Sequence, residues 1–460
     1  MKPRRMSDVA RAVDGLFLGE DVEVTTVCTD SRLATPGSLF VALPGEHTDG
    51  GLFVPEAFEL GAAGALVRDG LRVDGPAVSV RSTNEALIRL AVDERRRMGA
   101  TVVGVTGANG KTSTKDMTAA VLAPRFRTHA SPESFNNEVG LPVTLLTAPA
   151  DTEVVVAELG ARRKGDVTLL CEIARPDVVV VTNVGVAHLE IYGSWEAIVE
   201  ASAEPVDALG PGGVSVLNAD DQVVTGYAAR ADGRVVSFGL SGAADVRAEG
   251  VTLDAEGLAS FDVVVEGQRS RVALSVAGEH MVSNALASVA VGLTLGVELD
   301  AAAVAVSAAT VSHWRMETFT TPDGVRVVND AYNANPESVA AALKAARWMA
   351  RDARLIAVLG TMAELGPIAT AEHERLGDLA ARLRVDRVIA VGTWAEQIVT
   401  ASLREGVEPD NVAAYAEPQD ALDDVRAHAR AGDVVLFKAS RGIALEGLVE
   451  SLRAELGPAT

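Results

Sequence analysis

Cysteine is scarce in this chain of 460 residues, which contains only Cys28 and Cys171. The two residues lie far apart and form neither a CxxC pair nor the framework of a disulfide-stabilised secreted domain. We therefore expect ordinary thiols in a reducing compartment, which places the protein in the cytoplasm.

Long apolar runs are missing as well. No stretch of 18 uncharged apolar residues occurs, and the basic start MKPRRMSDVARAVDG is not followed by the apolar segment of a secretory signal. The sequence predicts neither export nor insertion into a membrane.

Positive charge is in short supply. The 41 Lys and Arg residues are outnumbered by 63 Asp and Glu residues, and the formal charge is −22. Such a surface repels phosphate backbones, so nucleic acid is not an expected partner, although a local basic pocket can still hold an anionic small molecule.

Aromatic residues make up only 4% of the chain, whereas 48% of it is hydrophobic. The core must then be built mainly from Ala, Val and Leu. A chain of this length is expected to divide that core among two or three domains.

Buried strands are indicated by short runs rich in Val that leave room for helices between them. These runs are TVVGVT (101–106), EVVVA (153–157), DVVVVT (177–182) and GVSVL (213–217). Continuous apolar runs are typical of strands covered on both faces, so we expect a mostly parallel α/β sheet. Residues 245–276 instead alternate apolar and polar residues, which predicts an antiparallel insert.

A second α/β pattern follows VSHWRME. The runs RLIAVLG, DRVIAVG and DVVLFKAS alternate with helical segments, which predicts a doubly wound domain. We place three α/β domains at residues 1–98, 99–312 and 313–460, the first ending in the helical stretch NEALIRLAVDERRRMG.

A glycine-rich loop follows the first of these strands, in TVVGVTGANGKTSTKD. A strict phosphate-binding loop, GxxxxGK[ST], has its first glycine where Val105 stands here, and a glycine falls at 107 instead. Glycines at 107 and 110 still let backbone N–H groups converge on phosphate oxygens at the start of a helix. The alternative is a tight turn between strand and helix. The predicted nucleotide contacts are Gly107, Ala108, Asn109, Gly110, Lys111, Thr112 and Ser113.

Three further segments contain residues suited to metal-dependent phosphoryl transfer. AELGARRKGD places Glu158 at the carboxyl end of a buried strand, where an unpaired carboxylate is costly. TNVGVAHLE places His188 similarly, although a structural loop histidine is the plainer reading. SFNNEVGLP offers Asn136 and Asn137 to a phosphate or a substrate, or it is simply an Asn-rich turn.

Nine segments then occur in one order: TGANGKTSTKD, SFNNEVGLP, AELGARRKGD, TNVGVAHLE, VLNADD, GEHMVSNALA, NDAYNANPES, LGTMAELG and KASRGIALE. The series resembles the Mur ligase family of bacterial cell-wall synthesis, from about residue 25 to about residue 450. DAYNANPxS and the early TDSR segment are most similar to the branch that adds D-alanyl-D-alanine to a UDP-linked muramoyl peptide.

The resemblance implies a reaction in two steps. The substrate carboxylate attacks the γ-phosphate of ATP, giving an acyl phosphate and ADP, and an incoming amine then displaces phosphate to form an amide. Such an enzyme needs ATP and Mg²⁺ and mostly positions reactants and stabilises charge. UDP-muramoyl peptide and a dipeptide are the implied partners of a monomer.

Carried over to this sequence, the resemblance implies roles for single residues. Lys111 and Thr112 would serve the phosphates and a first Mg²⁺, and Glu158 would be a ligand of a metal. His188 would bind a second metal ion. Arg315 would reach the γ-phosphate from the hinge, although a linker salt bridge is the plain alternative.

The remaining implied contacts belong to the nucleotide base and the two substrates. Asn284 would meet the adenine edge, and Asp330, unless it is a turn residue, would contact the ribose or the incoming amine together with Asn333 and Asn335. The UDP-sugar site would include Ser31 and Arg32, and the dipeptide carboxylate site Lys438, Ser440 and Arg441.

One departure from the family pattern is prominent. Ser202 stands where the family has a carbamylated lysine, and a serine cannot form that anion. Glu200 and Glu204 lie about 200° around a helix from this position, although Pro205 can change the path. We hypothesise that Glu204 replaces the anion. Thr361 and Gly51 are smaller departures, at positions where relatives often have an acidic residue and a histidine.

Two other functions stay open. The chain can be a Mur-like ligase recruited to another pathway, such as specialised metabolism, with its metal site rebuilt around Ser202. It can also be an inactive nucleotide-binding homologue, which would release no ADP with any pair of substrates.

Overall fold

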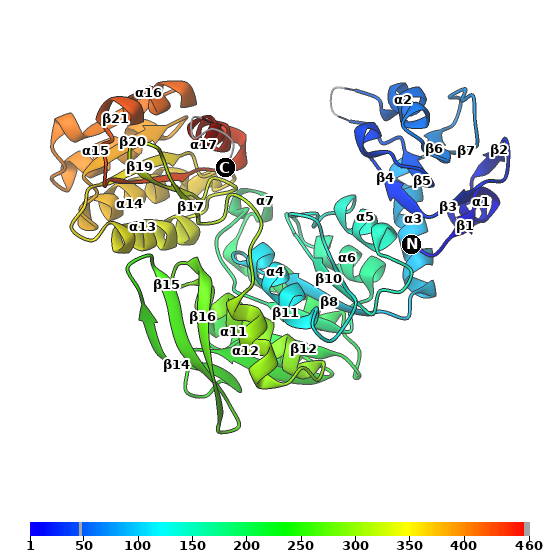
Figure 1. Ribbon diagram of the computed structural model, residues 1–460, viewed down its shortest axis with the longest axis horizontal. Coiled ribbons are helices and arrows are strands. Elements are labelled where there is room, and N and C mark those ends of the chain that lie inside the picture. Colours follow the sequence, from blue (N-terminus) through cyan, green and yellow to red (C-terminus); the bar gives the residue numbers. More distant parts are fainter. Residues whose placement is uncertain (46–47, 455–460) are drawn as a thin grey trace.

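The computed structural model describes residues 1–45 and 48–454. Three α/β units follow one another along the chain, and the first and third lie at opposite ends of the molecule with the second between them (Figure 1). The expected fold class is therefore confirmed, and one large sheet in each unit positions the residues of interest.

The first unit is built around a five-stranded sheet with the order β2-β7-β6-β5-β4, in which only β2 runs antiparallel to its neighbour. Its strands are β2 (Leu16–Leu18), β4 (Thr26–Cys28), β5 (Ser38–Val41), β6 (Gly64–Arg68) and β7 (Ala77–Val80). β1 (Arg4–Arg5) and β3 (Glu23–Val24) form a separate pair. The helices are α1 (Met6–Val13), α2 (Val54–Glu59) and α3 (Thr83–Arg97).

The second unit holds a nine-stranded sheet with the order β16-β15-β14-β13-β12-β11-β8-β10-β9. Its strands are β8 (Thr101–Thr106), β9 (Thr128–Ala130), β10 (Val154–Glu158), β11 (Val178–Val181), β12 (Val214–Asn218), β13 (Arg234–Gly239), β14 (Val246–Leu253), β15 (Leu258–Val265) and β16 (Gln268–Ala277). The four Val-rich runs form β8, β10, β11 and β12, which pair in parallel as expected.

The alternating segment forms the antiparallel strands β14, β15 and β16. These strands extend the edge of the same sheet, because β14 pairs in parallel with the end of β13. The helices of this unit are α4 (Lys111–Leu122), α5 (Gly140–Thr147), α6 (Asp166–Ala174), α7 (Leu189–Tyr192), α8 (Trp195–Ser202), α9 (Glu204–Asp207), α10 (Gln222–Gly226), α11 (Met281–Thr294) and α12 (Leu299–Ser307).

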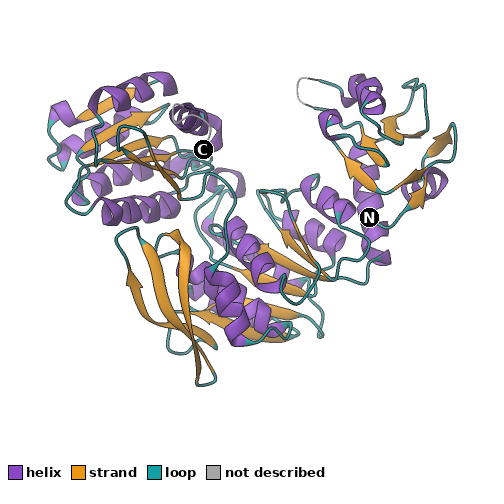
Figure 2. Ribbon diagram, viewed as in Figure 1, coloured by secondary structure: helices purple, strands orange, loops and turns teal. Residues whose placement is uncertain are grey.

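The third unit has a six-stranded sheet with the order β17-β18-β22-β19-β20-β21, parallel except for the edge strand β17. Its strands are β17 (Glu317–Thr320), β18 (Arg326–Asn329), β19 (Leu355–Gly360), β20 (Arg387–Val391), β21 (Val412–Tyr415) and β22 (Val434–Lys438). Its helices are α13 (Pro336–Ala350), α14 (Ala369–Arg382), α15 (Ala395–Arg404), α16 (Pro418–His428) and α17 (Leu445–Ala454). Helices cover both faces of this sheet, so the doubly wound prediction is confirmed (Figure 2).

The carboxyl ends of β8, β10 and β11 meet at one edge of the central sheet, because these strands are parallel neighbours. Polar residues that follow them are thereby brought together at the place where α/β sheets bind ligands. None of the helices in the described part of the chain has the length and apolarity needed to span a bilayer.

Candidate active site

The loop between β8 and α4 has the backbone that a phosphate site needs. Gly107 and Gly110 both have positive φ, at 132° and 79°. A Cβ at Gly107 would lie 2.1 Å from Thr182 Oγ1, and a Cβ at Gly110 would lie 2.4 Å from Asn284 Oδ1. Only glycine fits such positions. α4 begins directly after Gly110, and its free N–H groups point back over the loop.

Lys111 is folded back over this loop. Its Nζ donates to the carbonyl oxygens of Gly107, at 2.7 Å, and Ala108, at 3.2 Å. Burial lowers the pKa of Lys111, and the neighbouring Glu158 carboxylate opposes that shift. The ammonium group therefore lies beside the backbone that would hold a phosphate.

One hydrogen-bonded cluster joins four side chains from separate segments. Glu158, only 1% exposed at the end of β10, accepts a hydrogen bond on Oε2 from Thr112 Oγ1 at 2.8 Å. Its Oε1 accepts one from Asn136 Nδ2 at 2.8 Å. Arg315 Nη2 donates to Thr112 Oγ1 at 2.7 Å from the linker to the third unit. The structure thus brings together four residues that the sequence predicted from four different segments.

This cluster has the donor chemistry of a Mg²⁺ site. A hydroxyl and a buried carboxylate are hard oxygen ligands, and Mg²⁺ usually takes one or two carboxylates together with substrate phosphates. Within residues 1–45 and 48–454 no group of three or more His, Cys, Asp or Glu side chains could enclose a metal by itself. The site therefore fits a metal that arrives with a phosphate ligand.

His188 lies in the segment that follows β11, and its role as a metal ligand stays a prediction. It precedes α7 in a left-handed conformation with φ of 61°, and its Nδ1 contacts the carboxylate of Glu364 in the loop after β19. Burial lowers the pKa of His188, and Glu364 opposes the shift. The histidine therefore joins the second and third units, whereas Glu158 is bonded to Thr112 and Asn136.

Asn335 makes a second contact between these units. Its Oδ1 accepts a hydrogen bond from Ser338 N at 2.9 Å at the start of α13, and its Nδ2 donates to Asn109 Oδ1 at 2.8 Å. Asn109 is itself held by Asn183, whose Oδ1 accepts from Asn109 N at 2.8 Å. Asn183 was not among the predicted residues, although it lies in the TNVGVAHLE segment.

Asp330 and Lys438 form an ion pair, with 2.6 Å between Oδ2 and Nζ. Lys438 Nζ also donates to the carbonyl oxygen of Asn333 at 2.9 Å. Ser440 Oγ donates to the Ala334 carbonyl at 3.2 Å. Residues predicted for the ribose or amine and for the dipeptide carboxylate are therefore neighbours in one cluster.

Two aromatic rings support the arginines of this region. The guanidinium of Arg315 lies 4.3 Å from the ring centre of Tyr332, and that of Arg441 lies 5.2 Å from it. Arg441 also lies 5.4 Å from the ring centre of Trp314. Such stacking leaves the edge of a guanidinium free to donate hydrogen bonds. Neither aromatic residue was predicted, although both adjoin motifs that were.

Other predicted residues have structural partners. Asn137 Oδ1 accepts from Gly140 N at 2.8 Å at the start of α5, and Ser113 is buried within α4. Asn284 is 7% exposed beside Gly110. Ser31 donates to Glu56 at 2.5 Å, and Arg32 pairs with Asp30 at 2.6 Å, both in the first unit at the far end of the molecule (Figure 1).

The structure shows the partners of Glu204 and Glu200, and the hypothesis that Glu204 replaces the anion stays a prediction. α8 ends at Ser202, and α9 begins at Glu204. The Glu204 carboxylate accepts hydrogen bonds from Gly165 N at 2.6 Å and Thr168 N at 2.9 Å, so it is engaged at the start of α6. Glu200 pairs with Arg230 at 2.9 Å. Both carboxylates already have partners, because the chain turns between the two helices.

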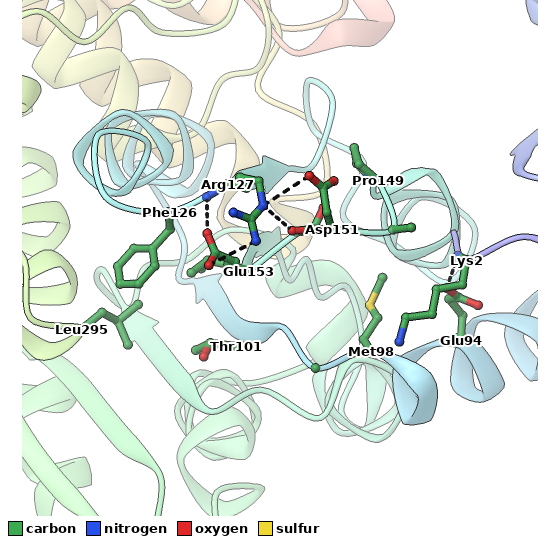
Figure 3. A pocket seen from close by; sticks show the side chains of 14 residues that line it. Lys2, Glu94, Met98, Thr101, Phe126, Arg127, Pro149, Asp151, Glu153 and Leu295 are labelled. Carbon is green, nitrogen blue, oxygen red and sulfur yellow. Dashed lines mark hydrogen bonds and ion pairs between the residues drawn. The ribbon is translucent and has the colours of Figure 1, made fainter.

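A cavity of about 570 Å³ lies at the opposite edge of the central sheet, lined by Thr101 and Val154, which begin β8 and β10. There Arg127 extends between Asp151 and Glu153, with 3.2 Å to an oxygen of each carboxylate (Figure 3). Its charge is already neutralised, and the phosphate loop is at the other end of β8.

Comparison with known proteins decides the family. Residues 23–102 match the description "Mur ligase family, catalytic domain", residues 105–292 the Mur ligase middle domain, and residues 314–441 the Mur ligase glutamate ligase domain. A Mycobacterium tuberculosis protein named UDP-N-acetylmuramoyl-tripeptide–D-alanyl-D-alanine ligase is 39% identical, over 94% of this chain and 92% of its own. The chain belongs to the Mur ligase family. It is therefore a ligase of carbon–nitrogen bonds, as the nine segments predicted.

Further relatives of this Mur ligase have the same name. The Bacillus subtilis protein is 35% identical, over 98% of this chain and 99% of its own. Among solved structures, MurF from Acinetobacter baumannii superposes with a TM-score of 0.86 at 29% identity, covering 98% of this chain and 99% of its own. MurF from Thermotoga maritima in complex with ADP superposes with a TM-score of 0.79 at 29% identity, covering 94% of this chain and 98% of its own.

Proposed function

We propose that this Mur ligase joins D-alanyl-D-alanine to a UDP-N-acetylmuramoyl tripeptide with hydrolysis of ATP to ADP and phosphate, in peptidoglycan precursor synthesis. Relatives with that name align over nearly the whole chain. The observation that carries the proposal is the reach of Arg315 from the linker to Thr112 beside the phosphate loop. This contact supports a phosphate position that the start of α4 and the linker would serve together.

The first step needs charge stabilisation at the γ-phosphate. Loop N–H groups and Lys111 would bind the phosphates, and Arg315 would neutralise charge on the group that is transferred. Thr112 and Glu158 would hold Mg²⁺, which as a Lewis acid spreads the charge of the phosphate oxygens. The substrate carboxylate then attacks in line, and ADP leaves.

The second step needs an amine held against the acyl phosphate. Arg441, which lies near the rings of both Trp314 and Tyr332, offers planar donors that suit the dipeptide carboxylate. Lys438 and Asp330, already paired, would lie beside the incoming amine. Positioning of this kind supplies much of the rate in such reactions.

The first unit would bind the UDP end of the substrate through Ser31 and Arg32. Because this unit lies far from the third unit, the reaction requires the units to close on one another (Figure 1). The third unit already contacts the phosphate loop through Asn335.

A phosphate-release assay tests the proposal with a panel of UDP-muramoyl peptides and amine acceptors. We expect release only when ATP, Mg²⁺, a UDP-muramoyl tripeptide and D-alanyl-D-alanine are all present. Phosphate release only with amine acceptors other than D-alanyl-D-alanine would indicate a ligase of another pathway. No phosphate release with any pair of substrates would indicate an inactive homologue. Either result overturns the assignment.

A further inference from the structure

Two charged residues one turn beyond the phosphate loop have no role in the proposed chemistry. The side chain of Lys115 is 2% exposed, and its Nζ lies 2.7 Å from Asp116 Oδ1. The same Nζ donates to the carbonyl oxygens of Ser131, at 2.7 Å, and Glu133, at 2.9 Å. A buried ammonium is costly without such oxygen partners, so Lys115 holds the loop that contains Ser131 and Glu133 against α4.

Asp116 is bonded to the linker between the second and third units. Its Oδ2 accepts hydrogen bonds from Ser312 N at 2.8 Å and Ser312 Oγ at 2.7 Å. Hydrogen bonds to a charged acceptor are stronger than neutral ones. α4 therefore holds the linker three residues before Arg315.

Arg315 is thus fixed from both sides by the same pair. Its Nη2 donates to Thr112 Oγ1 at 2.7 Å and to Ser134 Oγ at 3.2 Å. Ser134 directly follows Glu133, whose carbonyl Lys115 holds, and the linker is held by Asp116. The series of contacts that starts at Asp116 of α4 runs through the linker to Arg315. It then returns to α4, because Arg315 donates to Thr112.

We infer that Lys115 and Asp116 are positioning residues that aim Arg315 at the γ-phosphate and so give the site its preference for a nucleoside triphosphate over the diphosphate. The inference rests on the proposed ATP site. ADP would still be held by the loop and Lys111, which this pair does not touch. Loss of the pair therefore weakens only the interaction that the third phosphate adds.

Calorimetric titration with ADP and with a non-hydrolysable ATP analogue, both with Mg²⁺, tests the inference. Arg315→Ala should lower the affinity for the analogue about tenfold, as expected for loss of one charge-assisted contact. Asp116→Ala should lower it by about three- to tenfold and change ADP affinity less than about twofold, and it should add nothing in the Arg315→Ala background.

Ser312→Ala is the milder variant, because it keeps the Lys115–Asp116 pair and removes one hydrogen bond. It should shift the ratio of the two affinities in the same direction by about two- to threefold, and it carries the test if Asp116→Ala does not fold. Ser275→Ala is the matched control: its Oγ donates to Ala309 O at 2.7 Å near the same linker, and the ratio should not change.

Equal weakening of both nucleotides, or additive losses in the double variant, would show that the pair is only structural and would overturn the inference. If the wild-type protein binds neither nucleotide, the ATP site of the proposed function fails instead. The two failures are therefore distinct.

Discussion

The two junctions between units are built differently. At the first junction, α3 packs against α5 and α6, and Leu87 of α3 shares one apolar cluster with Leu141 and Leu170. At the second junction, polar side chains meet at the phosphate loop, as in the Asn335–Asn109 hydrogen bond. Apolar packing stabilises an arrangement without requiring a ligand, whereas polar contacts can be exchanged for contacts to a ligand.

The second junction also has contacts away from the loop, made by α13. Trp348 Nε1 of α13 donates to Asp254 O at 2.8 Å, in the turn between β14 and β15. Met349 lies against Gly257 in the same turn. The third unit therefore contacts the second unit at two places, at this turn and at the phosphate loop. Variants at the two junctions test what apolar packing and polar contacts each contribute.

Glu158→Gln breaks the polar junction at its centre and has the largest expected effect. Loss of the carboxylate charge should lower kcat by about 10²- to 10³-fold, a range typical for removal of one charge-stabilising group. Phosphate release measured across a Mg²⁺ titration checks this. Glu153→Gln is the control, since Glu153 lies one residue before the same strand at its other end and pairs with Arg127. Similar activity of the two variants would contradict the assignment.

Leu141→Ala tests the apolar junction. Leu141 is fully buried in α5, and its truncation should cost about 2–5 kcal/mol of the free energy of unfolding. Urea denaturation measures this change. The folded variant should keep wild-type affinity for ADP, because none of the residues 107–113 belongs to this cluster. If Leu141→Ala is as stable as wild type but binds ADP more weakly, the apolar junction serves nucleotide binding and not stability.

Asn335 distinguishes helix capping from contact between the units. Asn335→Asp keeps a side-chain acceptor for the start of α13 and loses the Nδ2 donor to Asn109. We expect an unchanged Tm and a phosphate-release rate reduced by about three- to tenfold. Asn335→Ala should lower both, with a stability loss of about 1 kcal/mol. If Asn335→Asp behaves like wild type in both measurements, the contact is not used.

His373 makes the loop that carries Glu364 sensitive to acid. Its Nε2 accepts from Met362 N at 2.9 Å, and burial lowers the pKa of this histidine. The unfolded chain therefore takes up the proton first, so stability is present above the unfolded value near 6.5 and falls as the pH drops below it. Urea denaturation at pH 7.5, 6.5 and 5.5 should give a smaller decline for His373→Gln than for wild type. If the free energy of unfolding declines equally with pH in both proteins, His373 is not the source of the acid sensitivity.

The smallest expected effect concerns Ser202 and the response of activity to bicarbonate. Without a lysine there, wild-type activity should not respond to bicarbonate at low pH, whereas Ser202→Lys should gain a response if the surrounding pocket accepts a carbamate. The assay is phosphate release with and without bicarbonate. Rescue of the wild type would mean that the family's lysine corresponds to another position.

Much of the fold followed from local patterns. Continuous Val runs identified β8, β10 and β11, since a strand covered on both faces needs apolar residues at every position. The Gly107–Thr112 loop was recognised because its glycines and lysine are adjacent in the sequence. Such features depend only on neighbouring residues.

The contacts between units could not be predicted in this way. His188 and Glu364 are 176 residues apart, and their meeting depends on how the third unit docks. Glu204 was considered as a metal ligand because it is an acidic residue near Ser202, although its helical angle pointed away from that position. Its actual partners at Gly165 and Thr168 lie on a helix that no sequence pattern connects to it.

The position of Lys111 has a consequence for the loop itself. By donating to the carbonyl oxygens of Gly107 and Ala108, the ammonium group ties the first residue of α4 to the two residues that follow β8. The same side chain that suits a phosphate therefore also stabilises the bend of the backbone around it, so its removal would cost the loop part of its shape as well as a positive charge.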